Sequence, residues 1–139
     1  MGAVRGLVAI AGACLAVAAC GAPMSGDAIG EAQLPHPKAG LWRWTSQAAG
    51  VRQLCLSGRV LTVLAERPGC PVSRRVRTDD GAFAVEADCG GQVGRLSARA
   101  QGDFDRDFVT DVAIGPARDH AEFRYVGACA PGQKPDDAL

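Results

Sequence analysis

Four aspartates crowd a short segment near the carboxyl end of the chain, and carboxylates at such spacing are ligands that calcium prefers. They are Asp103, Asp105, Asp107 and Asp111. The first three give the D-x-D-x-D opening of a calcium loop, but Phe108 stands where such a loop needs its turn glycine. Ile114 likewise replaces the bidentate glutamate that closes the loop. The pattern fails where calcium geometry is strict, so we expect no metal here.

A solvated strand face explains these aspartates better than a metal site does. If a hairpin turns at residues 101–103, Arg99 lies opposite Asp105 and Leu96 lies opposite Phe108. Arginine then partly balances the carboxylates across the hairpin. We therefore expect the acidic group to be a surface feature of a sheet.

A second group of charges is basic, and its members fall in two segments that we expect to form strands. They are Arg74, Arg75, Arg77, Arg95 and Arg99. Guanidinium forks suit phosphate oxygens, so a strip of these residues could touch anionic lipid or lipopolysaccharide. More often, arginines on a strand face only keep that face soluble, and both interpretations stay open at this point.

Neither histidine forms part of a catalytic set. His36 lies between two prolines, and His120 follows Asp119 in an expected turn. No serine or free cysteine is placed to act as a nucleophile beside either of them. We therefore expect a protein that is not an enzyme and that needs no cofactor.

Trp42 and Trp44 are the candidates for contact with an apolar ligand. They alternate within residues 40–46, so a strand there places both on one face. Packing in the core or lining of a cavity is their first expected role, and a platform for a ligand is the second.

The amino terminus has the profile of an export signal. Arg5 precedes an apolar run over residues 6–19. Residues 6–20 make only 15 positions, fewer than the ~18 that a helix needs to cross about 30 Å of hydrocarbon. We therefore predict that residues 1–19 are a signal peptide and not a permanent membrane span.

The end of this run, residues 15–21, resembles the bacterial lipobox, in which an aliphatic residue and two small residues precede a cysteine. The resemblance implies that Cys20 receives a diacylglycerol on its thiol, that the chain is cut before it, and that palmitate or a similar acyl chain joins the new amine. Gly21 after the cysteine implies the outer membrane, with the protein facing the periplasm. The alternative is an ordinary signal-peptide cut, with Cys20 incidental.

Removal of residues 1–19 leaves 120 residues, which is the size of one domain. Without Arg5, the chain carries 14 basic and 15 acidic side chains. This balance offers nucleic acid no basic surface, so we expect no nucleic-acid partner.

Beyond residue 38, apolar residues alternate with a period of two more often than with the helical period. We predict an all-β domain over residues 38–130, an antiparallel meander of about seven short strands that forms a curved sheet or a small barrel. Residues 57–66 are expected to form one short helix capped by Ser57, although their apolar centre suits a strand as well. We expect residues 20–37 to be a lipidated tether and residues 131–139 a disordered tail.

After loss of the signal peptide and lipidation, four cysteines remain, which favours two disulfides outside the cytoplasm. No pair has the close spacing of zinc ligands. Cys70 begins and Cys89 ends one hairpin of the meander, so they can meet at its open end. Cys129 ends the last strand at the opposite end of the sheet, which leaves Cys55 as its partner if the helix carries the chain across. Pairing of Cys55 with Cys70 is the alternative.

Several of these marks together resemble the proteobacterial envelope proteins grouped as domain of unknown function 3617. The matching residues are 38–42, Cys55, Leu56, Cys70, Asp88, Cys89, 102–104 and 125–129. The chain departs from the family at Ala39, where proline is usual, and at Arg43, where an acidic residue is usual. The family has no established activity, so the resemblance implies an envelope location and disulfides and adds no chemistry.

These observations favour an envelope lipoprotein, held to the membrane by its anchor, that acts as a non-enzymatic binding or interaction module for an envelope protein. The alternative is a small lipocalin-like carrier of an apolar ligand, suggested by a barrel and paired tryptophans. An enclosed apolar cavity beside Trp42 and Trp44 would favour the carrier, whereas a filled core would favour the module.

Overall fold

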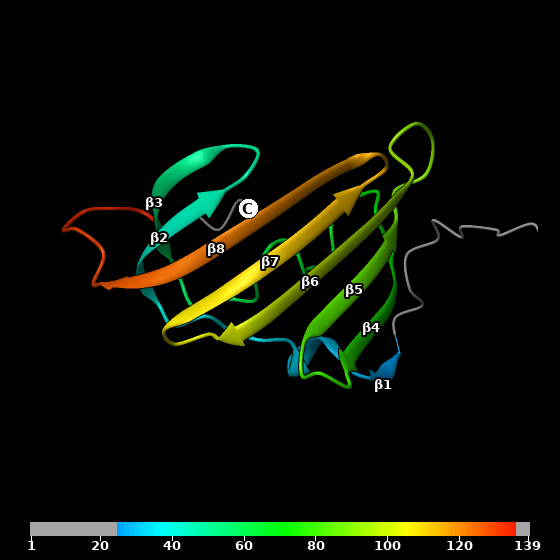
Figure 1. Cartoon of the computed structure of the whole chain (residues 1–139), viewed down its shortest axis with the longest axis horizontal. Coiled ribbons are helices and arrows are strands. Elements are labelled where there is room, and N and C mark those ends of the chain that lie inside the picture. The colour runs from blue at the N-terminus through cyan, green and yellow to red at the C-terminus, as the bar shows by residue number, and fades with distance from the viewer. Residues whose placement is uncertain (1–24, 136–139) are drawn as a thin grey trace, which may run out of the picture.

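A computed structural model describes residues 25–135 and shows eight antiparallel strands in one open sheet (Figure 1). The strands are β1 (Gly26–Ala28), β2 (Gly40–Ser46), β3 (Gly50–Leu56), β4 (Val72–Thr78), β5 (Phe83–Asp88), β6 (Arg95–Asp103), β7 (Asp107–Ile114) and β8 (Ala117–Gly127). The predicted all-β antiparallel class is confirmed, and the sheet is open rather than closed into a barrel. Within residues 25–135, no helix is long and apolar enough to span a membrane.

The strands run in the order β1-β4-β5-β6-β7-β8-β2-β3. Strands β4 to β8 form the expected meander, because each pairs with the next along the chain. The β2–β3 hairpin instead joins the far edge through β2, which pairs with β8. The chain must therefore cross from one edge of the sheet to the other between β3 and β4.

An eighth strand, β1, lies inside the segment that we expected to be a tether. Gly26 pairs with Thr78 and Ala28 pairs with Val76, so β1 extends the sheet beyond β4. Leu34, a few residues later, is only 2% exposed. The segment after residue 25 is therefore part of the folded domain. Alternation could not reveal this strand, because β1 is only three residues long.

The predicted helix over residues 57–66 is absent, and the only helix among residues 25–135 is the 3-10 turn η1 (Glu31–Gln33). The crossing segment makes a single turn, in which the Ala65 amide donates to the Leu61 carbonyl at 3.0 Å. That turn is enough to bury both Leu61 and Leu64. Val60, Thr62 and Val63 are β-branched and disfavour a longer helix, while the chain still has to reach the start of β4.

The β6–β7 hairpin turns later than expected, at residues 103–107, so the predicted register is wrong. Arg99 lies opposite Asp111, and Leu96 lies opposite Ile114. Gly102 belongs to the strand, where a Cβ would stand 2.7 Å from the Cα of Phe108. The Asp103 carboxylate accepts a hydrogen bond from the Asp105 amide at 2.9 Å and so stabilises the turn that follows Gly102. Close approach of two backbones, rather than a turn, explains this glycine.

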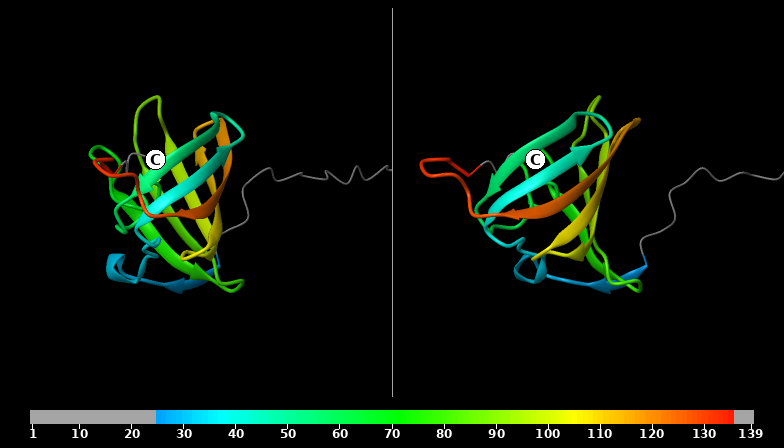
Figure 2. Two further views of the ribbon diagram at one scale, coloured as in Figure 1. Left: turned by 90° about the vertical axis from the view of Figure 1, so that its left-hand side faces the viewer. Right: turned by 60° about the vertical axis from the view of Figure 1, so that its left-hand side comes forward.

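One face of the curved sheet is covered by its own connecting segments (Figure 2). Leu34 precedes β2 and Leu61 and Leu64 lie in the crossing segment, and all three are buried in one cluster with the strand residues. The strands contribute their alternate side chains to this cluster, as in the buried, exposed alternation of β2. We call this side the buried face and the opposite side, which carries Arg43, the outer face.

Both predicted disulfides are present. Cys70 pairs with Cys89 beside the β4–β5 hairpin, and Cys55 pairs with Cys129 where β3 and β8 end. Strand direction places the two bridges at opposite ends of the sheet, as the meander predicted. The crossing segment of 57–71 therefore runs from one bridge to the other.

We predict that the two disulfides stabilise the domain unequally. Cys55–Cys129 closes a separation of 74 residues and Cys70–Cys89 one of 19. The loop-entropy relation then gives contributions of about 4.5 and about 3 kcal/mol to the free energy of unfolding. Urea unfolding of the double variants C55A/C129A and C70A/C89A measures both losses. An equal loss, or a larger loss for C70A/C89A, would contradict the entropic account.

Candidate functional site

Trp42 and Trp44 both lie on the buried face. Trp42 is 0% exposed, and its indole Nε1 donates to the Lys38 carbonyl at 2.8 Å. Its ring meets the edges of Phe108 and Tyr125 at centroid distances of 5.1 and 5.4 Å. Both the indole N–H and the ring of Trp42 are thus in contact with other groups of the protein.

Phe108 is the centre of the same aromatic group. It stacks on Phe123 at 4.4 Å and contacts Phe104 at 4.9 Å, while Phe104 in turn meets Phe83. Trp44 is 7% exposed and lies below the Arg52 guanidinium, which is 5.4 Å from its ring. Trp42 is thus enclosed by neighbouring side chains, and Trp44 is almost fully buried.

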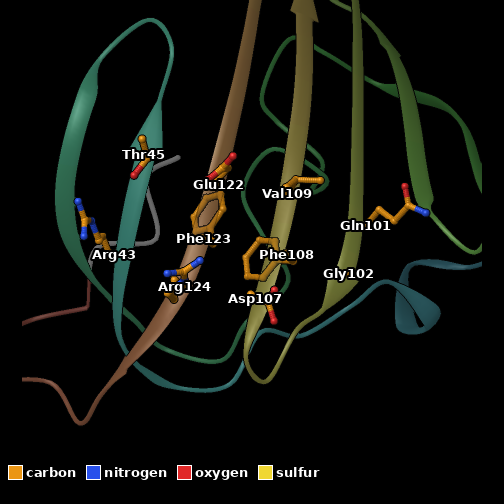
Figure 3. Close-up of a pocket in the computed structure, with 10 residues that line it drawn as sticks. All are labelled: Arg43, Thr45, Gln101, Gly102, Asp107, Phe108, Val109, Glu122, Phe123 and Arg124. Atoms are coloured by element: carbon orange, nitrogen blue, oxygen red, sulfur yellow. The ribbon is translucent and has the colours of Figure 1, made fainter.

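The outer face carries a groove of about 640 Å³ that crosses β6, β7, β8 and β2 (Figure 3). We call it the arginine groove. Its lining residues are Arg43, Thr45, Gln101, Gly102, Asp107, Phe108, Val109, Glu122, Phe123 and Arg124. The two phenylalanines belong to the buried core, so the side chains that the groove exposes to solvent are mainly polar.

Register places two like charges against each other in this groove. Arg43 lies directly opposite Arg124 across the β2–β8 pair, and both are exposed. Like charges that lie directly opposite each other destabilise a sheet by about 0.2–1 kcal/mol. Arg124 therefore has a like charge opposite it on its β2 side.

Two carboxylates flank the arginines. Asp107 lies opposite Arg124 on the β7 side, and Glu122 lies between Thr45 and Val109 in the adjacent row. Within residues 25–135, none of the four charged groups has an ion-pair partner within 4.0 Å. The arginine groove therefore presents two cations and two anions to solvent.

A second groove, of about 340 Å³, contains His120. His120 Nδ1 lies 2.7 Å from an Asp111 carboxylate oxygen. This hydrogen bond raises the pKa of His120, with smaller contributions from the charges of Asp111, Glu122 and Asp119. Asp119 itself accepts the Ser46 hydroxyl with both oxygens at 2.9 Å. Ser46 and His120 thus hydrogen-bond to different aspartates, so the histidine does not activate the serine as a nucleophile.

The arginines that could have formed a basic strip are divided between the two faces of the sheet. Arg75 pairs in register with Val85 on the buried face and lies between Glu31 and Glu66, at 3.9 and 3.8 Å. The Arg77 guanidinium lies 5.3 Å from the Phe83 ring. Arg99, on the outer face, pairs with Asp80; the Thr78 hydroxyl and this guanidinium together hold the pKa of the Asp80 carboxyl below its ordinary value.

Metal ligands do not gather in the part of the chain that the structure describes: no three histidine, cysteine or acidic side chains form a group there. Of the four clustered aspartates, Asp103 caps a turn and Asp111 binds His120. Cys20, the predicted lipid attachment site, and the signal peptide of residues 1–19 lie outside the described residues. His36 approaches the Gly58 carbonyl at 3.2 Å and so helps to join the two covering segments.

Sequence reasoning missed the arginine groove. Arg43 and Arg124 are 81 positions apart, and no local pattern marks them as neighbours. Only the pairing of β2 with β8 brings them together. The alternation of β2 did predict that Arg43 faces away from the tryptophans.

No family model, no curated protein and no solved structure matches this chain. The resemblance to the domain of unknown function 3617 family therefore stays a prediction. Function has to be inferred from the geometry of the described residues and from the amino-terminal sequence.

We predict that the His120–Asp111 contact makes stability depend on pH. Since the folded-state pKa of His120 is raised, its contribution is complete below the ordinary value of 6.5 and is lost as the pH rises through the raised pKa. D111N should lower the His120 pKa in an NMR titration. It should also reduce the free energy of unfolding by less than about 1 kcal/mol at acidic pH, given solvent screening, and not at all at alkaline pH.

D105N is the matched control, since Asp105 is an exposed aspartate of the same acidic segment outside this contact. It should leave the His120 titration unchanged. An equal shift in both variants would show that general surface charge, and not the 2.7 Å contact, governs His120.

Proposed function

We propose that this protein is an envelope lipoprotein, anchored through acylated Cys20, that acts as a non-enzymatic binding module through its arginine groove. One observation carries the proposal for the groove. Four exposed charges, Arg43, Arg124, Glu122 and Asp107, have no ion-pair partners within residues 25–135, although two of them oppose each other at a cost. A ligand with complementary charges would remove that cost.

The envelope location is supported by two observations. The domain has disulfides at both ends of its sheet, and disulfides persist in oxidising compartments such as the periplasm. The sequence before the domain resembles a signal peptide with a lipobox at Cys20. Several acyl chains on one cysteine would hold the protein firmly, because each buried methylene contributes about 0.8 kcal/mol.

The packing around Trp42 favours the module over the lipocalin-like carrier. A carrier needs an apolar space that its ligand can enter. The ring of Trp42 is instead enclosed by Phe108 and Tyr125, and its N–H is satisfied by Lys38. Entry of an apolar ligand here would have to displace contacts that stabilise the fold.

The anchor is tested by substitution of Cys20. We expect the wild-type protein to partition into Triton X-114 and to have a mature amino terminus at Cys20 with the mass of a diacylglycerol and an additional acyl chain. C20A should partition into the aqueous phase, because it has no thiol to acylate. C14A, within the predicted signal peptide, should behave as wild type. A wild-type product that starts elsewhere or stays in buffer would refute the anchor.

The groove is tested by photo-crosslinking in intact cells. A photoreactive residue at Thr45 should give a discrete adduct, and the same residue at the exposed Val93, outside the groove, should not. R124E should reduce the Thr45 adduct at least several-fold, because it reverses one groove charge. R95E, an exposed outer-face arginine, is the control and should have no effect. A Thr45 adduct that is absent or insensitive to R124E would refute the groove as the binding surface.

A further inference from the structure

The charge arrangement of the arginine groove identifies the chemistry of its ligand, an inference that rests on the proposed function. We propose that the groove binds a zwitterionic phosphate ester, in which a phosphate lies between Arg43 and Arg124 and a primary ammonium lies beside Glu122. The same chemistry occurs in a phospholipid headgroup and in its free soluble ester.

The two arginines fit a phosphate better than a carboxylate. Directly opposed side chains in an antiparallel pair have their Cβ atoms about 4.5–5.5 Å apart, so both guanidiniums can reach one small anion. A guanidinium fork donates two parallel hydrogen bonds, and one arginine can occupy both oxygens of a carboxylate. A phosphate offers further acceptor oxygens to the second fork. The negative charge of the phosphate would also offset the repulsion between Arg43 and Arg124.

Glu122 and Asp107 restrict the ligand to one with a positive group of its own. The two carboxylates balance the two arginines, so the groove has a basic centre with acidic sides. A polyanion would place its further charges against those carboxylates. Glu122 lies two residues before Arg124 on the same face of β8, roughly 7 Å along the strand, which suits a short spacer between phosphate and ammonium. A primary ammonium can donate hydrogen bonds to Glu122, whereas a quaternary one cannot.

Exposed valines lie at the margin of the same surface. Val51 is 56% exposed and pairs with Thr45, and Val126 is 53% exposed and follows Arg124 by two residues, where the β2–β8 register shifts. Apolar groups beside a phosphate site suit the glycerol and first acyl carbons of a lipid. These valines favour the membrane lipid over the free ester as the source, and the experiment separates the two.

The test is calorimetric titration of the full-length mature protein in an uncharged detergent. The probes are glycerophosphoethanolamine, glycerophosphate, and the short-chain lipids dihexanoyl-phosphatidylethanolamine and dihexanoyl-phosphatidylglycerol. We expect the ethanolamine compounds to bind at least about five times more tightly than their partners without ammonium. Tighter binding of the lipid than of glycerophosphoethanolamine would assign the source to membrane lipid, and equal binding would assign it to the soluble ester.

Variants separate the two halves of the site. R43Q/R124Q should weaken binding of both ethanolamine compounds at least tenfold, whereas R95Q should leave it unchanged. E122Q should remove the preference for ammonium and retain binding of the phosphate. R43Q alone should leave the melting temperature equal to or above that of wild type, because it relieves the opposed charges. A lower melting temperature would show that Arg43 serves the fold and would overturn the proposal.

Three outcomes separate this inference from the proposed function. If none of the four probes binds but the Thr45 adduct in cells still depends on Arg124, the ligand class is wrong and the binding module stands. If glycerophosphate binds as tightly as glycerophosphoethanolamine and E122Q has no effect, the zwitterionic assignment is wrong. Loss of both probe binding and the Thr45 adduct would refute the groove altogether.

Discussion

The buried face of this open sheet is covered by loops, because the described residues contain no long helix that could cover it. Leu34, Leu61 and Leu64 provide that cover and close over the aromatic group centred on Phe108. The two disulfides fix the segment that carries Leu61 and Leu64 at both of its ends. We therefore place the proposed ligand site on the outer face.

One strand pairing determines both faces. In the β2–β8 register, Trp42 and Trp44 lie opposite Tyr125 and Phe123 on the buried face, which places Arg43 opposite Arg124 on the outer face. A slip by one residue would exchange the faces and expose the tryptophans, so burial of the aromatic rings enforces the opposition of the arginines. The core therefore fixes a like-charge pair on the outer face, next to the opposite-charge pair of Arg124 and Asp107.

Much of the fold could be predicted from period-two alternation and from strand direction, which together indicated seven of the strands and both disulfide pairs. Three features could not be predicted in this way. Strand β1 is too short to show alternation, and the crossing over residues 57–71 has an apolar composition that a helix, a strand or a single turn would all accept. Gly102 looks like a turn residue in sequence and is a close-approach residue in space.

The candidate site was less predictable than the fold, because its members are brought together only by tertiary pairing. Arg43 and Arg124 meet through β2 and β8, which are hydrogen-bonded neighbours at opposite ends of the domain sequence. The arginines that the sequence analysis grouped together, such as Arg75 and Arg99, are instead divided between faces and bound to nearby carboxylates. The proposal that the buried face is closed to ligands and that a ligand binds the outer face is tested most directly by acrylamide quenching of Trp42 fluorescence in a W44F variant. Sealing predicts weak quenching and an emission spectrum that saturating fatty acid leaves unchanged; ready quenching, or a spectral shift with fatty acid, would contradict it.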